Sequence, residues 1–355
     1  MAADADMTRR RRRRSPSLPC TVRVQAAGFA LGHRRDGSVR RLFFSLLDIH
    51  VRAKRRRPDA AGVRSVDVTI DASRGLWARI FSPSPTKREA AQPLPVVVFF
   101  HGGGFVLFSA ASCYYDRLCR RICRELRAVV VSVNYRLAGP ARRFPAAYDD
   151  GLAALRYLDA NGLAAEAAGV AAVDLSSCFL AGDSAGGNMV HHVAQRWAAA
   201  SAASQSSSTL RLAGAVLIQP FFGGEERTEE ELELDEVALT LSLARTDYYW
   251  REFLPEGATR DHPAAHVCGG GGGEHDVEVA EAFPPAMLAI GGFDLLKGWQ
   301  ARYVEALRGK GKAVRVVEYP GAIHGFCLFP ELADSGELVE EMKLFVQEHR
   351  TKRVQ

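Results

Sequence analysis

The chain has 355 residues, and 47% of them are hydrophobic, which is enough for one large α/β domain or two small domains. Its formal net charge is +5, but without the six arginines of Arg9–Arg14 it falls to −1. This near-neutral balance argues against a nucleic-acid-binding fold, whose basic residues would be spread over a folded face. No apolar run approaches the roughly eighteen residues of a membrane-spanning helix, so no membrane partner is expected.

The N-terminal region is the first part of the chain to be interpreted. Residues 1 to about 20 contain almost no large apolar side chains, and we place a disordered, arginine-rich tail over residues 1–28. The run Arg9–Arg14 fits nuclear import, RNA binding, a transit peptide or a solvated tail without a dedicated role. Residues 29–60 are partly apolar and then basic, which predicts a short amphipathic helix or a pair of helices.

Strand patterns begin after this segment. The first two runs predict an antiparallel hairpin around a turn, whereas Pro95–Phe100 and Ala128–Val133 are continuous β-rich runs, as in parallel strands that are buried on both faces, and four later runs are further candidates for buried strands. A helical pattern covers Ala111–Leu126, and similar patterns separate most of the later runs. The sequence therefore predicts an α/β fold with a mostly parallel central sheet of about eight strands and helices on both faces. The predicted strands are Ser65–Ile70, Leu76–Phe81, Pro95–Phe100, Ala128–Val133, Cys178–Gly182, Ala213–Gln219, Ala286–Gly291 and Val314–Tyr319.

Two stretches interrupt this alternation. Residues 223–267 are charged at first and then aromatic, which predicts an inserted cap. Residues 268–280 include five consecutive glycines, and we expect a mobile loop there. The remainder, residues 29–350, is expected to form a single domain.

The segment around Ser184 carries the first chemical signal. An apolar run ends at Gly182, the pattern Gly-x-Ser-x-Gly continues to Gly186, and an amphipathic helix follows. A serine on such a strand-to-helix turn projects its hydroxyl from the edge of the sheet, and a β-carbon at either glycine would crowd the turn. The alternative is an ordinary glycine-rich turn. The strand and helix on either side favour a nucleophile.

A second glycine-rich segment follows the strand Pro95–Phe100. His101 is followed by three glycines and Phe105, so the backbone can approach a substrate closely. A flexible loop or a phosphate cradle are alternatives, but the Gly-Lys-Ser/Thr of a phosphate loop is absent. We assign the N–H groups of Gly103 and Gly104, together with that of Ala185, to an oxyanion hole.

A nucleophilic serine needs a base and a carboxylate that orients the base. Asp294 follows the run Ala286–Ile290, and His324 follows the run Val314–Tyr319. Both lie beyond the carboxyl ends of predicted strands, at the edge of the sheet where Ser184 also lies. In the chain order serine, aspartate, histidine, these residues form a candidate catalytic triad.

Taken together, these motifs resemble the hormone-sensitive-lipase group of α/β-hydrolases. The sequences His101–Phe105, Gly182–Asn188 and Ile323–Phe326 carry the resemblance, and Asn134–Leu137, Tyr148–Gly151 and Leu254–Gly257 narrow it to the plant carboxylesterases, a family that also contains the gibberellin receptors. The similarity covers residues 29 to about 350. It implies an α/β-hydrolase fold and a cofactor-free serine esterase.

The resemblance also implies further properties. Residues 29–60 would fold over the pocket as a lid, and Tyr115 and Tyr249 match positions that face the ligand in the receptors. Phe105 is a further candidate for an apolar substrate pocket. The expected substrate is a small, moderately apolar carboxylic ester. A non-catalytic receptor for a gibberellin-like hormone is the alternative, although the presence of His324 favours hydrolysis and a serine at 184 argues against the related threonine dehydratases.

The remaining expectations concern cofactors, partners and location. The seven cysteines lack a zinc-binding spacing, so no metal site is predicted and the thiols are expected to be reduced. No cofactor is expected. The partner is a small-molecule ester, with no nucleic acid bound through the folded domain, and the chain is expected to be a monomer or a weak dimer. A cytoplasmic location is expected, with nuclear import through Arg9–Arg14 as an addition.

Overall fold

The fold is built on one eight-stranded sheet with the order β1-β2-β4-β3-β5-β6-β7-β8. The computed structural model describes residues 15–350 except 56, 85–92, 164–171, 204–207 and 269–276. The predicted arginine run and the five glycines therefore lie outside the described residues. The strands are β1 Val63–Asp71, β2 Leu76–Pro83, β3 Leu94–Phe100, β4 Val129–Asn134, β5 Val173–Asp183, β6 Leu212–Ile218, β7 Ala286–Phe293 and β8 Val314–Ile323.

The pairing of these strands confirms the predicted sheet. β1 and β2 form an antiparallel hairpin, and β2 also pairs antiparallel with β4, whereas β4, β3, β5, β6, β7 and β8 are mutually parallel. Phe100 lies opposite Gly182 in the register of β3 and β5. The segments that follow β3 and β5 therefore emerge side by side, which is what brings the glycine-rich loop to Ser184.

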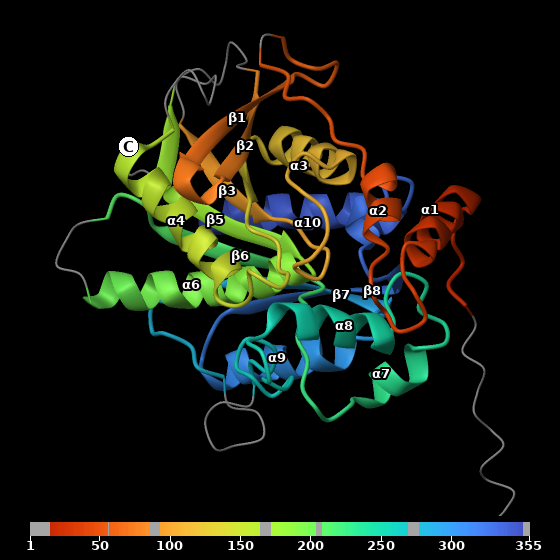
Figure 1. Cartoon of the computed structure of the whole chain (residues 1–355). Helices are drawn as coiled ribbons and strands as arrows, with labels where there is room; N and C mark the ends of the chain where they lie inside the picture. The colour runs from red at the N-terminus through yellow and green to blue at the C-terminus, as the bar shows by residue number, and fades with distance from the viewer. Residues whose placement is uncertain are drawn as a thin grey trace, which may run out of the picture.

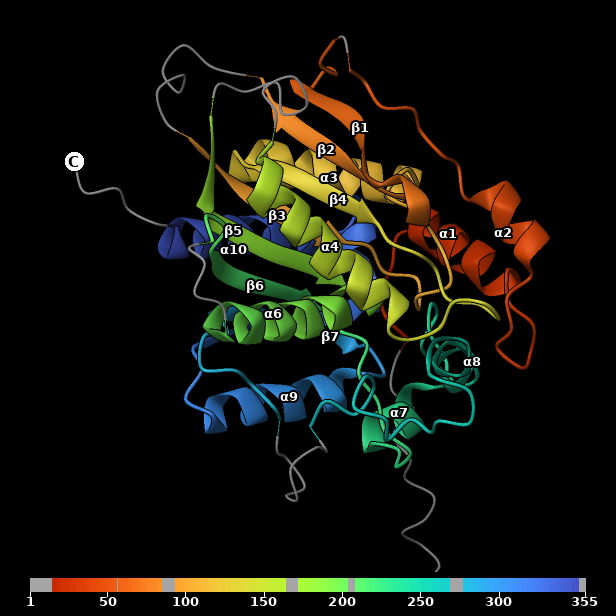
Figure 2. The ribbon, with the colours of Figure 1, turned by 60° about the vertical axis from the view of Figure 1, so that its left-hand side comes forward.

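Helices cover both faces of the sheet (Figure 1). The long helices are α3 Cys113–Leu126, α4 Ala146–Asn161, α6 Ala185–Ala203, α9 Lys297–Gly309 and α10 Ala333–His349. Alternation along β3 separates two cores, because Val96, Val98 and Phe100 pack with α4, α6 and α9, whereas Val97 and Phe99 pack with α3 and α10. Figure 2 shows α4 and α6 lying together over one face of the strands.

The first N-terminal helix begins earlier than the sequence suggested. α1 spans Cys20–Leu31 and α2 spans Arg41–Leu47, so the predicted tail over residues 1–28 is wrong from Cys20 onward. The reason is that Val22 and Ala26, four residues apart on one face of α1, are fully buried against the domain. We call residues 20–50 the lid.

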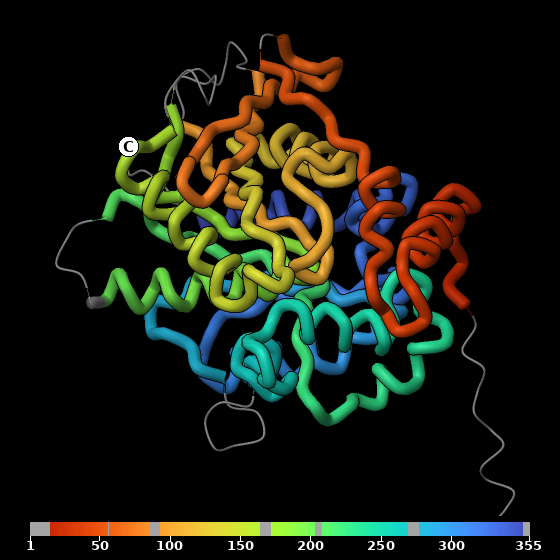
Figure 3. Tube along the Cα trace, viewed as in Figure 1, coloured from red at the N-terminus to blue at the C-terminus, as the bar shows by residue number. Residues whose placement is uncertain are grey.

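The segment between β6 and β7 supplies two further helices, α7 Glu229–Leu234 and α8 Leu243–Phe253. Figure 3 shows the lid and this segment next to each other at one end of the molecule. A direct contact joins them, because the His33 Nε2 atom of the lid lies 2.6 Å from the Tyr249 hydroxyl of α8. Among the described residues, no helix combines the length and the apolar character needed to cross a bilayer.

Candidate active site

Ser184 stands on a sharp turn between the end of β5 and the start of α6. Its φ angle is 54°, in the left-handed region that costs a non-glycine residue about 1–3 kcal/mol. A β-carbon at Gly186 would lie 1.9 Å from the carbonyl oxygen of Phe100, so the turn can only form with glycine at this position. The predicted strand–turn–helix geometry around the serine is therefore present.

The structure brings Ser184, His324 and Asp294 together, although they lie far apart in the sequence. His324 Nε2 is 2.9 Å from Ser184 Oγ, and His324 Nδ1 is 2.9 Å from Asp294 Oδ2. The carboxylate is fully buried, and its Oδ1 accepts a hydrogen bond from the Leu296 N–H while its Oδ2 accepts another from Gln300. With Nδ1 donating to this fixed carboxylate, Nε2 is left to accept the proton of the serine hydroxyl.

The loop that carries His324 is held from two sides. The Gln219 side chain donates to the Ile323 carbonyl and accepts from the Gly325 N–H, at 3.2 and 2.8 Å. The Thr240 hydroxyl donates to the His324 carbonyl at 2.8 Å. Sequence reasoning missed both residues. The only signal for Gln219 is that a polar residue ends the apolar run of β6 at the edge of the sheet where the site lies.

Burial and the neighbouring carboxylate act in opposite directions on His324. Burial alone would lower the pKa of the imidazole, but the charge of Asp294 and the hydrogen bond to it raise the pKa above the usual 6.5. Protonated His324 therefore stabilises the fold below about pH 6.5, and this contribution is lost as pH rises through the folded-state pKa. The same carboxylate would stabilise the imidazolium that forms when the serine gives up its proton.

These opposing effects predict the pH dependence of hydrolysis. Only neutral His324 can accept the serine proton, so kcat/KM is expected to rise with pH through a midpoint above 6.5. In Asp294→Asn the midpoint is expected to move to lower pH, because only the charge of Asp183 then opposes the effect of burial. Profiles of kcat/KM against pH for both proteins test this. A wild-type midpoint below 6.5, or an unchanged midpoint in the variant, would contradict it.

The glycine-rich loop after β3 lies beside the serine. Gly103 and Gly104 both line the cavity at Ser184, with φ angles of 100° and 59°. Within the described part of the chain, their N–H groups donate to no acceptor. Ala185 is the first residue of α6, where helical N–H groups have no partner inside the helix. Gly103 and Gly104 therefore line the same cavity as Ser184, and Ala185 directly follows the serine.

A buried hydrogen-bond network, which sequence reasoning missed, ties this loop to the serine turn. The Gly102 N–H lies 2.8 Å from the Tyr115 hydroxyl and 3.0 Å from Asp183 Oδ1, and Tyr115 donates to Asp183 Oδ2 at 3.0 Å. Burial raises the pKa of Asp183 to about 6, so the carboxylate is ionised at neutral pH. Tyr115 lines the cavity as predicted, but its hydroxyl is engaged in holding the loop. The position of Asp183, directly before Ser184, was the available signal.

The cavity above Ser184 has a volume of about 350 Å³ and a mostly apolar wall. It lies between the sheet edge, the lid and α8, and Tyr249 lines it as predicted. A β-carbon at Gly104 would lie 2.3 Å from the Tyr249 ring, so the two are in close contact. The lining residues from the lid and its surroundings are Val24, Gln25, Gly28, Phe29, Phe44, Leu47, Asp48, Phe108, Tyr114, Leu241, Leu328 and Phe329.

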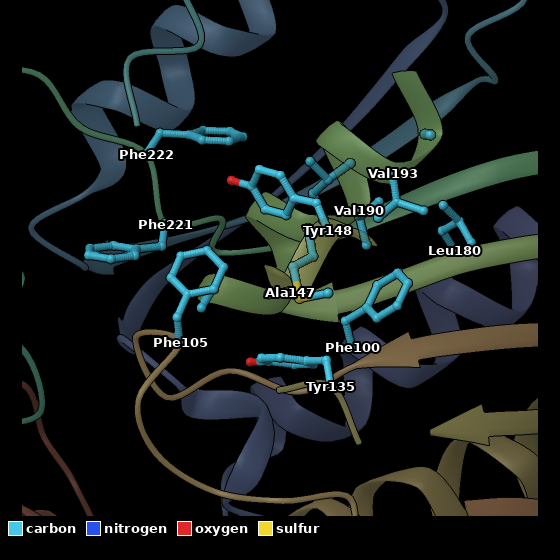
Figure 4. Packing of buried hydrophobic residues seen from close by; sticks show 14 of the residues in the cluster. Phe100, Phe105, Tyr135, Ala147, Tyr148, Leu180, Val190, Val193, Phe221 and Phe222 are labelled. Atoms are coloured by element: carbon cyan, nitrogen blue, oxygen red, sulfur yellow. The ribbon is translucent and has the colours of Figure 1, made fainter. Parts of the chain in front are cut away.

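Phe105 is not part of this wall, and its predicted role in substrate binding is corrected. The side chain is fully buried and stacks on Phe253 of α8 with ring centroids 3.7 Å apart. Figure 4 shows its ring among those of Phe221 and Tyr148 in the core. The backbone at Phe105 has a positive φ of 65°, like that of the two glycines before it.

The lid is fastened over the cavity by a buried hydrogen bond. His33 Nδ1 donates to the Phe29 carbonyl at 2.9 Å, so Nε2 is an acceptor for the Tyr249 hydroxyl. Burial and, to a smaller extent, the nearby charge of Arg245 lower the pKa of His33 to about 4, although the hydrogen bond to the Phe29 carbonyl acts in the opposite direction. The imidazole is therefore neutral at physiological pH, as this pattern of hydrogen bonds requires.

Removal of the Tyr249 hydroxyl is expected to loosen the lid. In Tyr249→Phe, the buried His33 Nε2 loses its donor, which costs about 1–3 kcal/mol. Hydrogen exchange of the amides in α1 and α2 is expected to accelerate accordingly. The neighbouring Tyr248→Phe is the matched control, because the Tyr248 hydroxyl has no hydrogen-bond partner among the described residues. Equal protection of the lid in Tyr249→Phe and wild type would contradict the fastening role.

Comparisons with known proteins agree with this architecture. The model of a family with the α/β hydrolase fold matches residues 97–328. The gibberellin receptor GID1C of Arabidopsis thaliana is 37% identical over 344 residues, which cover 93% of this chain and 94% of the receptor. Carboxylesterase 20 of the same plant is 37% identical over 272 residues, which cover 74% of this chain and 78% of that protein.

A solved structure gives the same result for the fold. The ester hydrolase EH1AB1 from the metagenome of Lake Arreo superimposes with a TM-score of 0.72 and 26% sequence identity, over 93% of this chain and 97% of that chain. Carboxylesterases among the relatives and esterases among the structural neighbours support a carboxylic ester hydrolase. The resemblance seen in the sequence motifs is confirmed. The chain belongs to the α/β-hydrolase fold family, in the branch shared by plant carboxylesterases and gibberellin receptors.

Proposed function

We propose that the chain is a serine carboxylesterase that hydrolyses small, moderately apolar carboxylic esters. One observation carries the proposal: His324 lies 2.9 Å from Ser184 on one side and 2.9 Å from the buried Asp294 on the other. This is the arrangement in which a histidine can take and return the proton of a nucleophilic serine. The mostly apolar wall of the cavity supports an apolar acyl or alcohol group.

The reaction requires two acyl transfers, first from the ester to Ser184 and then from Ser184 to water. Ser184 Oγ attacks the ester carbonyl carbon while its proton moves to His324 Nε2, and the carbonyl oxygen becomes an anion facing Gly103, Gly104 and Ala185. His324 then gives the proton to the leaving alcohol oxygen as the carbon–oxygen bond breaks. Water, deprotonated by His324, releases the acid from the serine and restores the hydroxyl. Each N–H donor to the oxyanion contributes about 10²–10³ in rate.

Hormone binding without catalysis is the second candidate. The observation that favours it is the match to gibberellin receptors over 93% of the chain, a longer match than the one to carboxylesterase 20. In this alternative the cavity would hold a carboxylic-acid hormone, and the triad would be vestigial. The contact between His324 and Ser184 supports hydrolysis over this alternative.

Hydrolysis of p-nitrophenyl acetate and butyrate by the purified protein distinguishes the two. Turnover that saturates with substrate and rises with pH is expected for the esterase. A folded protein that releases no p-nitrophenol above the buffer rate would refute the proposal. Gibberellin binding to that same protein, measured by calorimetry, would then establish the receptor alternative.

A further inference from the structure

Exposed apolar side chains are concentrated on the lid and on the segment beside it (Figure 3). In the described part of the chain, nine large apolar side chains are exposed, and all but Leu344 lie on these two segments. Single exposed apolar residues are normal on a protein surface, but such a concentration marks an interaction surface. The members on the lid, which we call the apolar lid surface, are Val24, Leu31, Leu42, Leu46, Leu47 and Ile49, and those on the neighbouring segment are Leu232 and Leu239.

Both lid helices turn apolar residues outward. Val24 and Leu31 are seven residues apart and share one face of α1, and Leu42 and Leu46 are four residues apart and share one face of α2. The two leucines of α2 are 85% and 81% exposed, so they project from the surface and do not line a groove. Val24 and Leu47 also line the cavity above the serine. The apolar lid surface therefore continues into the mouth of the cavity.

The segment that carries this surface is strongly basic. Residues 20–57 contain ten lysines and arginines against two aspartates, which gives a net charge of +8. Residues 58–355 have a net charge of −7, and residues 1–19 supply the remaining +4 of the total of +5. On the lid, the side chains of Arg23, Arg35 and Arg40 are exposed and have no hydrogen-bond or salt-bridge partner among the described residues. These cations are therefore available to a negatively charged partner.

Leucines that project beside unpaired arginines suit the surface of an anionic bilayer. The apolar side chains can enter the acyl region while the arginines stay at the level of the phosphates. A bilayer deforms around projecting side chains, whereas a protein partner would need a surface of matching shape. The acidic remainder of the chain is repelled by the same lipids, so the charge distribution turns the lid toward the bilayer.

We propose that the lid docks on anionic lipid surfaces, with the apolar lid surface inserted below the headgroups. Because Val24 and Leu47 belong both to this surface and to the cavity wall, the mouth of the cavity then faces the bilayer. An apolar ligand dissolved in the lipid can reach Ser184 without crossing bulk water. Docking requires no spanning helix, which was the only membrane contact that the sequence-based expectation considered. The inference does not depend on whether the site hydrolyses its ligand.

Sedimentation with lipid vesicles tests the docking on the full chain. Vesicles of three parts phosphatidylcholine to one part phosphatidylglycerol are expected to bind the protein at least about tenfold more tightly than vesicles of phosphatidylcholine alone. This preference is expected to shrink at about 1 M salt, because the charges of the lid are then screened. A folded protein that does not sediment with the anionic vesicles would overturn the proposal.

A double substitution assigns the contact to the lid. Leu42 and Leu46 do not line the cavity, and Leu42→Ser/Leu46→Ser is expected to weaken binding to the anionic vesicles at least about tenfold. Leu344→Ser makes the same change at an exposed leucine of α10 and should leave binding unchanged. Circular dichroism verifies that each variant is folded. Unchanged binding in the double variant would place the contact elsewhere, such as on Arg9–Arg14, and would overturn the proposal.

The charge of the lid is tested separately. Arg23→Gln/Arg35→Gln/Arg40→Gln is expected to lower the affinity for anionic vesicles at least about tenfold and to leave the affinity for neutral vesicles unchanged. Arg156→Gln, at an exposed position of α4, is the control and is expected to change either affinity by less than about twofold. Equal affinities of the triple variant and the wild type for anionic vesicles would refute the role of the lid cations.

Two further measurements distinguish insertion from other ways of covering the surface. The fluorescence of Leu46→Trp is expected to be quenched by vesicles that contain dibrominated phosphatidylcholine, beyond the quenching of the native tryptophans, and that of Leu344→Trp is not. Binding without this quenching would overturn the proposal. Sedimentation velocity without lipid is expected to give a monomer. A dimer that dissociates in Leu42→Ser/Leu46→Ser would assign the surface to a second copy of the chain and would overturn the proposal as well.

Discussion

Ser184→Ala is expected to lower kcat for p-nitrophenyl ester hydrolysis by about 10⁶-fold, because the attacking oxygen is lost. His324→Ala is expected to cost nearly as much, since Ser184 Oγ then has no acceptor for its proton at 2.9 Å. The double variant should be no worse than either single variant, because residues that act as one unit are not additive. The residual rate would come from the N–H donors and from substrate binding.

The fold must survive these substitutions if the losses are to be interpreted as catalytic. Alanine at 184 faces the same backbone strain as serine at a φ of 54°, so thermal stability is expected to change little. Ser73→Ala, in the turn between β1 and β2, is the matched control and should keep wild-type kinetics. Substantial turnover by a folded Ser184→Ala protein would show that another group is the nucleophile.

Gly186→Ala is expected to have the largest effect on the fold around the site. The new methyl carbon would lie 1.9 Å from the Phe100 carbonyl oxygen and 2.6 Å from its carbon, and both atoms belong to the backbone of β3. Because β3 cannot yield as a flexible side chain would, the free energy of unfolding is expected to fall by about 3 kcal/mol. Movement of Phe100 also displaces the loop that begins at His101, so kcat/KM should fall by about 10²-fold even where the protein remains folded.

Gly309→Ala is the control for the same chemical change. Gly309 ends α9, and a β-carbon there would meet no atom within 4 Å. The substitution is expected to stabilise the chain by less than about 1 kcal/mol, since alanine favours the helical conformation. Urea unfolding monitored by circular dichroism compares the two variants. A Gly186→Ala protein as stable as Gly309→Ala would show that the turn is looser than its geometry implies.

The predicted sheet is correct because its strands are unusually easy to recognise. β3 and β6 are buried on both faces and therefore appear as unbroken apolar runs, and β4 is interrupted within its apolar part only by Ser132, a pattern that no surface helix would contain. The site residues then follow from topology. In a parallel sheet the carboxyl ends of the strands share one edge, so Ser184, Asp294 and His324 were predicted to approach each other without any knowledge of distances.

The failures of prediction have a different physical origin. α1 was missed because its apolar residues are spread around the helix: Val22 and Ala26 are buried, whereas Val24 and Leu31 are exposed. Phe105 follows three glycines, and the local sequence does not distinguish a ring that enters the core from one that lines the cavity. Local composition indicates neither property.

Contacts between segments that are distant in the sequence could not be predicted either. His33 and Tyr249 are 216 positions apart, and nothing in either local pattern indicates that they share a hydrogen bond. Such contacts depend on tertiary packing, and sequence periodicity does not predict them.

Covalent capture of Ser184 tests the central claim most directly. Ethyl p-nitrophenyl hexylphosphonate presents a phosphorus that the serine oxygen attacks with loss of p-nitrophenolate, and the stable adduct can be located by peptide mass spectrometry. The account predicts one adduct per chain, on Ser184, formed together with one equivalent of p-nitrophenolate and strongly slowed in His324→Ala. A folded protein that forms no adduct, or that carries the adduct on another residue, would contradict it.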